Sequence, residues 1–308
     1  GLSFRAAMAA VSATLIRSSM TSRVRGAGTV GTGVGAGAGV GRHPAVQRRA
    51  PGALGSDEDD VGQHAEATGR SQRGPGGAAE GLRVALALAR DVHGAHADFV
   101  AGRERYGLDG NRTARRVAGS TLGFVGFGDL GRAIHALSAG FRCRTIVHDP
   151  WLSPEELARE GLESVSLDEL LGRADVVHVV AAVTAESRHL IGARELSLMP
   201  DGASLVLLSR ADVVDFPALL DACREGRVRA ATDVFPEEPL PLDHPARTTP
   251  NLLLSAHRAG ALESALLEIG ERVVVDLELM ARGLPPQSCK RAEPELVERL
   301  RSRPVTRS

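Results

Sequence analysis

The chain has 308 residues, of which 43% are hydrophobic and 24% are charged, and its formal net charge is −1. This length can hold two domains, and the near-neutral charge excludes a global field that would attract nucleic acid or an anionic membrane. An aromatic content of 3% argues against a base-stacking surface, and no apolar run approaches the ~20 residues of a membrane helix.

The first quarter differs sharply in composition from the rest of the chain. Residues 1–56 contain no Asp or Glu, and residues 26–41 are rich in glycine. A segment with this much glycine loses too much backbone entropy on folding to become ordered unless it buries a large apolar surface. We therefore expect residues 1–77 to be low in complexity and disordered. An acid-poor, Arg-rich start is also typical of an organellar transit peptide, and that alternative remains open.

The cysteines indicate the compartment. Cys143, Cys223 and Cys289 lie far apart and show no Cys-x-x-Cys spacing. This fits a reducing environment and argues against a disulfide framework or a zinc site. We expect a cytoplasmic protein without a metal centre.

Periodic structure begins near residue 78. Apolar residues recur at three- and four-residue steps over residues 79–99, which predicts one helix. A polar stretch with Gly107 and Gly110 follows. We assign residues 78–118 to a linking helix and its loop.

From residue 119 the pattern alternates between strands and helices. Strands are predicted at 121–126, 144–148, 176–180, 204–208, 230–234 and 252–255, and helices at 130–139, 154–161, 167–172 and 216–225. Repeated βα units of this length predict an α/β fold for residues 119–260, a Rossmann-like doubly wound parallel sheet. Residues 261–286 carry a long amphipathic helix ended by glycine and proline, and residues 287–308 form a charged tail that we expect to be loose.

The turn after the first strand carries a dinucleotide fingerprint, Gly126-Phe127-Gly128-Asp129-Leu130-Gly131. Gly126 permits the tight turn, Gly128 lets a pyrophosphate approach the backbone, and Gly131 lets the helix pack closely on the strand. Asp149 follows the second strand at a spacing of 149 − 131 = 18 residues, close to the ~20 expected for the acid that binds the ribose. An acid there favours NAD over NADP. The alternative is that Asp149 only caps the Asp149-Pro150 turn, and the neighbouring histidine leaves some room for NADP.

Three later loops each carry one side chain with catalytic potential. Arg210, Glu238 and His257 each follow a short β-like apolar run. A guanidinium, a carboxylate and an imidazole beside a nicotinamide are what reversible oxidation of a 2-hydroxy acid needs. Singly, they could be a surface charge, a solvated turn and a loop histidine. Their order behind a nucleotide fingerprint favours the catalytic interpretation.

With these motifs, the chain resembles the D-isomer-specific 2-hydroxyacid dehydrogenase family, which includes phosphoglycerate dehydrogenase. The resemblance runs from about residue 78 to residue 286. The matching segments follow the family order: residues 123–131, 148–150, 174–178, the loop around Thr184, then 209–210, 213–215, 233–239 and 257–260. Any one could arise by chance, but the ordered set is specific.

The resemblance implies a role for each residue. Arg210 should grip the substrate carboxylate and polarise the 2-oxo group, and His257 should exchange a proton with the C2 hydroxyl. Glu238 should orient the imidazole and stabilise its protonated form. The expected cofactor contacts are Gly126, Gly128, Leu130, Gly131, Asp149, Ser209, Asp233 and Gly260. The implied protein is an NAD-dependent oxidoreductase for the CH–OH group of a D-2-hydroxy acid, a homodimer joined through the helix at 79–99.

The chain departs from the family pattern in three places. Ala211 stands where the family usually has glycine, and Arg258 follows the histidine where a small or apolar residue is common. Arg258 could disfavour a charged imidazole or contact an anionic substrate. The family's substrate domain, of about a hundred residues, is not recognisable in residues 1–77. A suitable codon choice for residues 62–65, shifted by one nucleotide, yields the family's Ala-Asn-Thr-Pro, so residues 1–77 could be an out-of-frame reading.

The alternative function is a non-catalytic NAD-binding sensor or interaction module.

Overall fold

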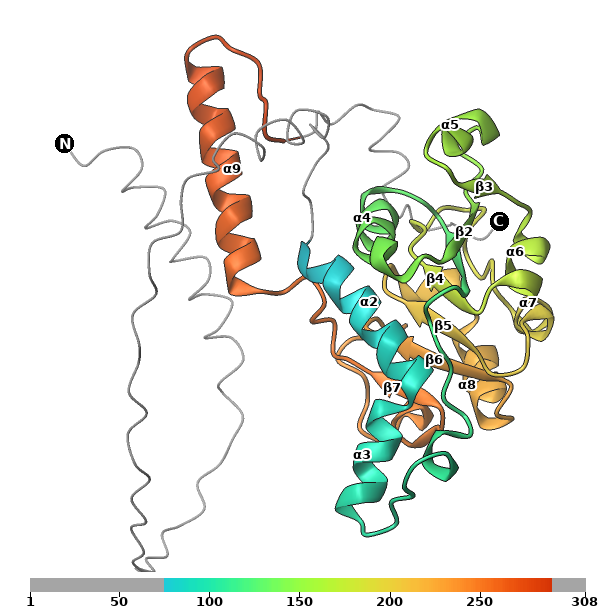
Figure 1. Cartoon of the computed structure of the whole chain (residues 1–308). Coiled ribbons are helices and arrows are strands. Elements are labelled where there is room, and N and C mark those ends of the chain that lie inside the picture. The colour runs from blue at the N-terminus through green and yellow to red at the C-terminus, as the bar shows by residue number, and fades with distance from the viewer. Residues whose placement is uncertain (1–74, 290–308) are drawn as a thin grey trace, which may run out of the picture. The chain divides into compact units, whose positions relative to one another are not determined.

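A computed structural model describes residues 75–289 (Figure 1). The predictions for residues 1–74 and 290–308 lie outside the described residues. No helix within the described range combines the length and the apolar character needed to cross a membrane.

The described part is built on a seven-stranded sheet with the order β3-β2-β1-β4-β5-β6-β7, and every neighbouring pair is parallel. The strands are β1 (Thr121–Val125), β2 (Arg144–His148), β3 (Glu163–Ser164), β4 (Val176–Val179), β5 (Ala203–Leu207), β6 (Val228–Thr232) and β7 (Leu252–Leu254). The chain moves outward from β1 to β3 and then returns to β4 on the other side of β1. This reversal creates a switch point beside the carboxyl end of β1, where open α/β sheets bind their ligands. The predicted Rossmann-like doubly wound fold is confirmed.

Helices cover both faces of the sheet (Figure 1). The covering helices are α2 (Pro75–Arg90), α4 (Asp129–Ser138), α5 (Pro154–Arg159), α6 (Leu167–Arg173), α7 (Ala193–Leu198) and α8 (Phe216–Arg224). Two further helices, α3 (Val92–Val100) and α9 (Glu263–Ala281), contribute no residue to the apolar clusters of the sheet. One apolar cluster joins α2, α4 and α5 to one face of the sheet, and a second joins α6, α7 and α8 to the other. Alternate residues of a strand feed the two clusters, as Leu205 and Val206 do in β5. Burial on both faces explains the nearly continuous apolar sequence of β4 and β5.

The predicted helix at 79–99 is two helices. It begins earlier than expected, at Pro75, and it breaks at Asp91, whose φ of 49° lies in the left-handed region. The carbonyl of Ala89 accepts a hydrogen bond from the backbone N–H of Arg115 at 2.6 Å, which favours ending α2 there. The break also separates two environments, because α2 buries Val84 and Leu88 whereas α3 has no buried residue.

The long helix predicted after residue 261 is present as α9, and Asp276 is its only buried residue. The carboxylate of Asp276 accepts hydrogen bonds from the backbone N–H groups of Gln287, Ser288 and Cys289 at 2.8, 2.8 and 2.6 Å. These bonds, that from Ser288 above all, lower the pKa of Asp276 to about 2. The tail that we expected to be loose from residue 287 is therefore anchored to α9 through residue 289.

Candidate active site

The predicted site residues follow strands that end at the same edge of the sheet. Because the strands are parallel, their carboxyl ends meet there, and the loops after them can share one site. The residues that follow these ends are Gly126 after β1, Asp149 after β2, Ser209 and Arg210 after β5, Asp233 after β6, and His257 after β7.

The glycine loop between β1 and α4 has the geometry that a dinucleotide pyrophosphate needs. Gly126 has a φ of +84°, and a Cβ there would lie 2.6 Å from Cα of Ala181. At Gly131 a Cβ would lie 3.2 Å from the carbonyl oxygen of Gly126, a tight contact, so glycine favours this close packing. A Cβ on Gly128 would meet nothing within 4 Å, which leaves open space beside the start of α4. Free N–H groups and the helix dipole favour an anion in that position, so these residues fit the cofactor.

Leu130 contributes to this loop through its backbone. Its side chain packs against the apolar cluster beneath α2 and α4. Its backbone N–H is one of the first four of α4, which lack partners within the helix. At Leu130, the backbone N–H and not the side chain is therefore suited to a phosphate oxygen.

Asp149 holds two backbone groups together. One carboxylate oxygen accepts a hydrogen bond from the N–H of Phe127 at 2.8 Å, and the other accepts from the N–H of Trp151 at 2.9 Å. The second bond is the turn cap that the sequence offered as an alternative role. The first fastens the glycine loop to the end of β2. Each oxygen has a further lone pair, so both contacts are compatible with binding of ribose hydroxyls.

The imidazole and the carboxylate predicted to act together are hydrogen-bonded. Nδ1 of His257 lies 2.7 Å from Oε2 of Glu238, and Oε1 of Glu238 accepts from the N–H of Phe235 at 3.0 Å. Partial burial opposes ionisation of Glu238, but these bonds and the nearby charges of His257 and Arg210 leave its pKa below the usual value. Glu238 is therefore an ionised acceptor that fixes one ring nitrogen of His257 and leaves Nε2 outside this hydrogen bond.

The loop that carries His257 is held by a second carboxylate. His257 has a φ of +51°, and the buried Asp233 accepts hydrogen bonds from the N–H groups of Arg258 and Ala259, each at 2.8 Å. The sequence interpretation placed Asp233 at the nicotinamide and missed these bonds to the loop. One available signal was its position directly after an apolar strand, where a buried carboxylate needs N–H donors.

Arg210 is exposed and leaves most of its donors available. Its Nη1 donates to the carbonyl oxygen of Ser209 at 2.6 Å, and it forms no ion pair with any residue from 75 to 289. The hydroxyl of Ser209 is buried and has no hydrogen-bond partner among the described residues. A buried hydroxyl without a partner is expected where a ligand completes the site. Gly260 is exposed, and a Cβ there would also meet nothing within 4 Å.

The comparison with known sequences begins with a family. The model of "D-isomer specific 2-hydroxyacid dehydrogenase, NAD binding domain" matches residues 82–259. The glyoxylate reductase of Aeropyrum pernix is 37% identical over 175 residues, which cover 56% of this chain and 52% of the reductase. The D-3-phosphoglycerate dehydrogenase of Methanocaldococcus jannaschii is 33% identical over 208 residues, or 66% of this chain and 38% of that protein. The chain thus spans about half the length, or less, of these relatives.

Solved structures agree with the sequence comparison. A phosphoglycerate oxidoreductase from Rhizobium etli is 51% identical with a TM-score of 0.67, covering 71% of this chain and 67% of that chain. The NAD-dependent formate dehydrogenase of Staphylococcus aureus, solved in complex with NAD, is 26% identical with a TM-score of 0.60, covering 71% and 64%. The family model spans more than half of the chain, and the domain that it describes binds NAD. The chain therefore belongs to the D-isomer-specific 2-hydroxyacid dehydrogenase family and carries that family's NAD-binding domain.

Proposed function

We propose that this chain provides the cofactor-binding and catalytic part of an NAD-dependent oxidoreductase that acts on the CH–OH group of a D-2-hydroxy acid. The observation that carries the proposal is the 2.7 Å hydrogen bond between His257 and Glu238, on the edge of the sheet that also carries Arg210 and the glycine loop. Gly126, Gly128 and Gly131 would hold NAD, which would supply a hydride acceptor for the C2 carbon or, in its reduced form, a hydride donor.

Each of these side chains has one task in the proposed reaction. Nε2 of His257 takes the proton of the C2 hydroxyl during oxidation and gives it back during reduction of the 2-oxo acid. The ionised Glu238 stabilises the resulting imidazolium through Nδ1 and keeps the ring in one orientation. The guanidinium fork of Arg210 binds the substrate carboxylate through two parallel hydrogen bonds, a geometry that lysine cannot provide.

The names of the relatives suggest which acids to test. A glyoxylate reductase and a D-3-phosphoglycerate dehydrogenase both act on small acids, and the second acid carries a phosphate as well. Arg258, directly after the proposed catalytic histidine, is exposed and supplies a cation for such a second anionic group. We further propose that the protein is cytoplasmic and forms a homodimer.

A non-catalytic NAD-binding module is the second candidate, and exposure of the site favours it. The side chains of His257 and Glu238 keep 48% and 35% of their surface accessible. Water that reaches reacting groups weakens the electrostatic interactions between them and competes with substrate. A module that only binds NAD would not need a closed site.

Assays of the full chain separate the two candidates. We expect NADH-dependent reduction of glyoxylate or NAD-dependent oxidation of D-3-phosphoglycerate, and a decrease of roughly a hundredfold or more in turnover for His257→Ala. The affinity for NAD should stay nearly unchanged in that variant, because His257 acts on the substrate. Glu155→Ala, a change at an exposed residue of α5, is the control. NAD binding with no turnover of either acid would favour the module, and unchanged turnover of His257→Ala would contradict the catalytic assignment.

A further inference from the structure

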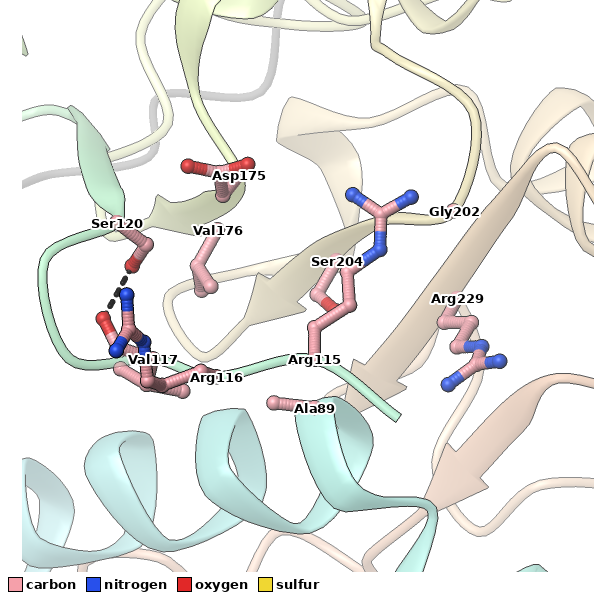
Figure 2. A pocket seen from close by; sticks show the side chains of 10 residues that line it. All are labelled: Ala89, Arg115, Arg116, Val117, Ser120, Asp175, Val176, Gly202, Ser204 and Arg229. Carbon is pink, nitrogen blue, oxygen red and sulfur yellow. Dashed lines mark hydrogen bonds between the residues drawn. The ribbon is translucent and has the colours of Figure 1, made fainter. Parts of the chain in front are cut away.

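The opposite edge of the sheet, where the strands begin, holds a small cavity (Figure 2). It encloses about 30 Å³, and a single water needs roughly 10–15 Å³ measured in this way. The cavity therefore takes one small group rather than a nucleotide. Its polar lining comes from the segment before β1, from the starts of β4 and β5, and from β6: Arg115, Arg116, Ser120, Asp175, Ser204 and Arg229.

Positive charge dominates this lining. The lining contains three arginines and one carboxylate, that of Asp175, which gives it a formal charge of +2. Figure 2 shows the arginines spread around Ser204 and Val176 rather than gathered on one side. Within residues 75–289, none of the three forms an ion pair with a carboxylate. The carboxylate of Asp175 accepts a hydrogen bond from the backbone N–H of Thr121 at 2.9 Å.

Most of the guanidinium donors remain available. Arg115 donates to the carbonyl oxygen of Asp201, and Nη1 of Arg229 donates to the carbonyl oxygen of Leu88 at 3.3 Å. Arg116 makes no hydrogen bond through its side chain to another described residue. A guanidinium carries five N–H donors, so these contacts position two of the arginines and leave donors for an anion. Charge-assisted bonds from arginine to phosphate or carboxylate oxygens are among the stronger hydrogen bonds in proteins.

We propose that this cavity is a second binding site for a small oxyanion, either inorganic phosphate or the phosphate group of a monoester. The formal charge of +2 matches a phosphate dianion, and the volume admits the phosphate group alone. The site is separate from the NAD site, because strands of four to five residues with a rise of ~3.3 Å each place the two edges roughly 15 Å apart.

The test is a calorimetric titration of the full chain with inorganic phosphate in the presence of saturating NAD, which blocks the glycine loop. One phosphate should bind per chain. Arg116→Gln should weaken binding about tenfold, the effect of losing one charge-assisted hydrogen bond. Asp175→Asn should strengthen binding, because it removes the only carboxylate and keeps an oxygen that can accept from Thr121. Arg159→Gln, at an exposed arginine of α5, is the matched control.

Three outcomes would overturn the proposal: no phosphate binding in the absence of NAD, loss of binding when NAD is added, or equal affinities in Arg116→Gln and Asp175→Asn. A parallel titration with glycerol phosphate separates the two ligand sources. Equal binding of the ester indicates that the site takes phosphorylated metabolites, whereas binding of inorganic phosphate alone indicates that it takes the free ion. Neither result depends on turnover, so failure here is distinguishable from failure of the proposed enzyme activity.

Discussion

His257 adopts a backbone conformation that residues other than glycine seldom occupy, with a φ of +51°. The two hydrogen bonds from Arg258 and Ala259 to Asp233 offset the cost of this conformation and fix the direction of the imidazole. Asp233 is thus a positioning residue for the proposed proton transfer. Asp233 is 2% exposed and follows the end of β6, so little water competes for these bonds.

This role predicts the effect of Asp233→Asn. An amide accepts through one oxygen only, so one of the two N–H groups would face another donor, at a cost of about 1–3 kcal/mol. We expect a clear fall in kcat that exceeds the change in NAD affinity, measured by steady-state kinetics together with NAD titration. Asp221→Asn, on the exposed side of α8, serves as the control. A variant that loses NAD affinity but keeps its kcat would instead support the nicotinamide contact predicted from the sequence.

Arg210→Lys tests the geometry of the proposed carboxylate contact. Lysine keeps the positive charge and loses the planar fork, so we expect kcat/KM for the acid to fall by at least an order of magnitude. The same change at Arg224, an exposed arginine of α8, should have no such effect. Wild-type kinetics in Arg210→Lys would show that only the charge matters.

At this scale the sequence predicted some contacts and missed others. The pairing of Glu238 with His257 followed from a resemblance in motif order, and the hydrogen bond between them is present. Their catalytic roles remain predictions. The bonds from the His257 loop to Asp233 were missed, because they depend on β6 and β7 lying side by side, and a linear pattern does not give strand adjacency.

Among the elements, β4 contains a polar side chain in an apolar position. His178 is 1% exposed, its ring stacks on Phe124 at a centroid distance of 5.1 Å, and its Nδ1 has no partner among the described residues. Burial lowers the pKa of His178 to about 4 from 6.5. The folded protein therefore binds a proton at His178 less readily than the unfolded chain does.

The pH dependence of stability follows from this difference. The neutral His178 contributes to the free energy of unfolding. This contribution is complete above about pH 6.5, declines as the pH falls and is lost near pH 4, and the total change is on the order of 3 kcal/mol. His178→Leu should flatten the unfolding free energy between these pH values in denaturant titrations. An unchanged slope in His178→Leu would show that other groups cause the acid sensitivity.

The predictions of helices and strands were wrong where tertiary contacts outweighed the local sequence pattern. Most strands and helices were placed within one or two residues, because buried strands and amphipathic helices leave strong apolar patterns. The two-residue β3 is too short to leave such a pattern. The six-residue α7 was also missed, whereas α5, of the same length, was predicted. The break at Asp91 depends on the contact between Ala89 and Arg115, which lie 26 residues apart along the chain (115 − 89).

For the whole molecule, the remaining prediction concerns self-association. The helix α3 buries none of its residues, and Val92, Phe99 and Val100 keep 56%, 61% and 73% of their surface exposed. Such a surface favours an interface between two copies of the chain, in line with the family resemblance. We expect a dimer at micromolar concentration in sedimentation velocity, shifted toward monomer by Phe99→Asp. The exposed Tyr106→Asp is the control, and a monomeric wild type would refute the prediction.

The sheet as a whole could be predicted from the sequence, but the cavity at the amino ends of its strands could not. Alternation of strands and helices indicates a parallel sheet, and a parallel sheet brings the carboxyl-end loops together. The cavity on the amino edge draws on separate segments, and each of its arginines looks in sequence like an ordinary surface charge. Only the folded structure shows that Arg116 and Arg229 line the same cavity.

The hydrogen bonds of Asp276 determine where the chain leaves α9. Three consecutive N–H groups bond to a residue five positions before the end of the helix, so the chain reverses direction after α9 (Figure 1). The bond from Cys289 places this residue beside α9, about 8 Å back from the end of the helix. Any label, tag or fused partner attached after residue 289 therefore starts from the side of this helix. In distance measurements, a probe at Cys289 would report the position of the side of α9. Asp276→Ala would remove the hydrogen bonds that hold residues 287–289 there, and the probe distance would change.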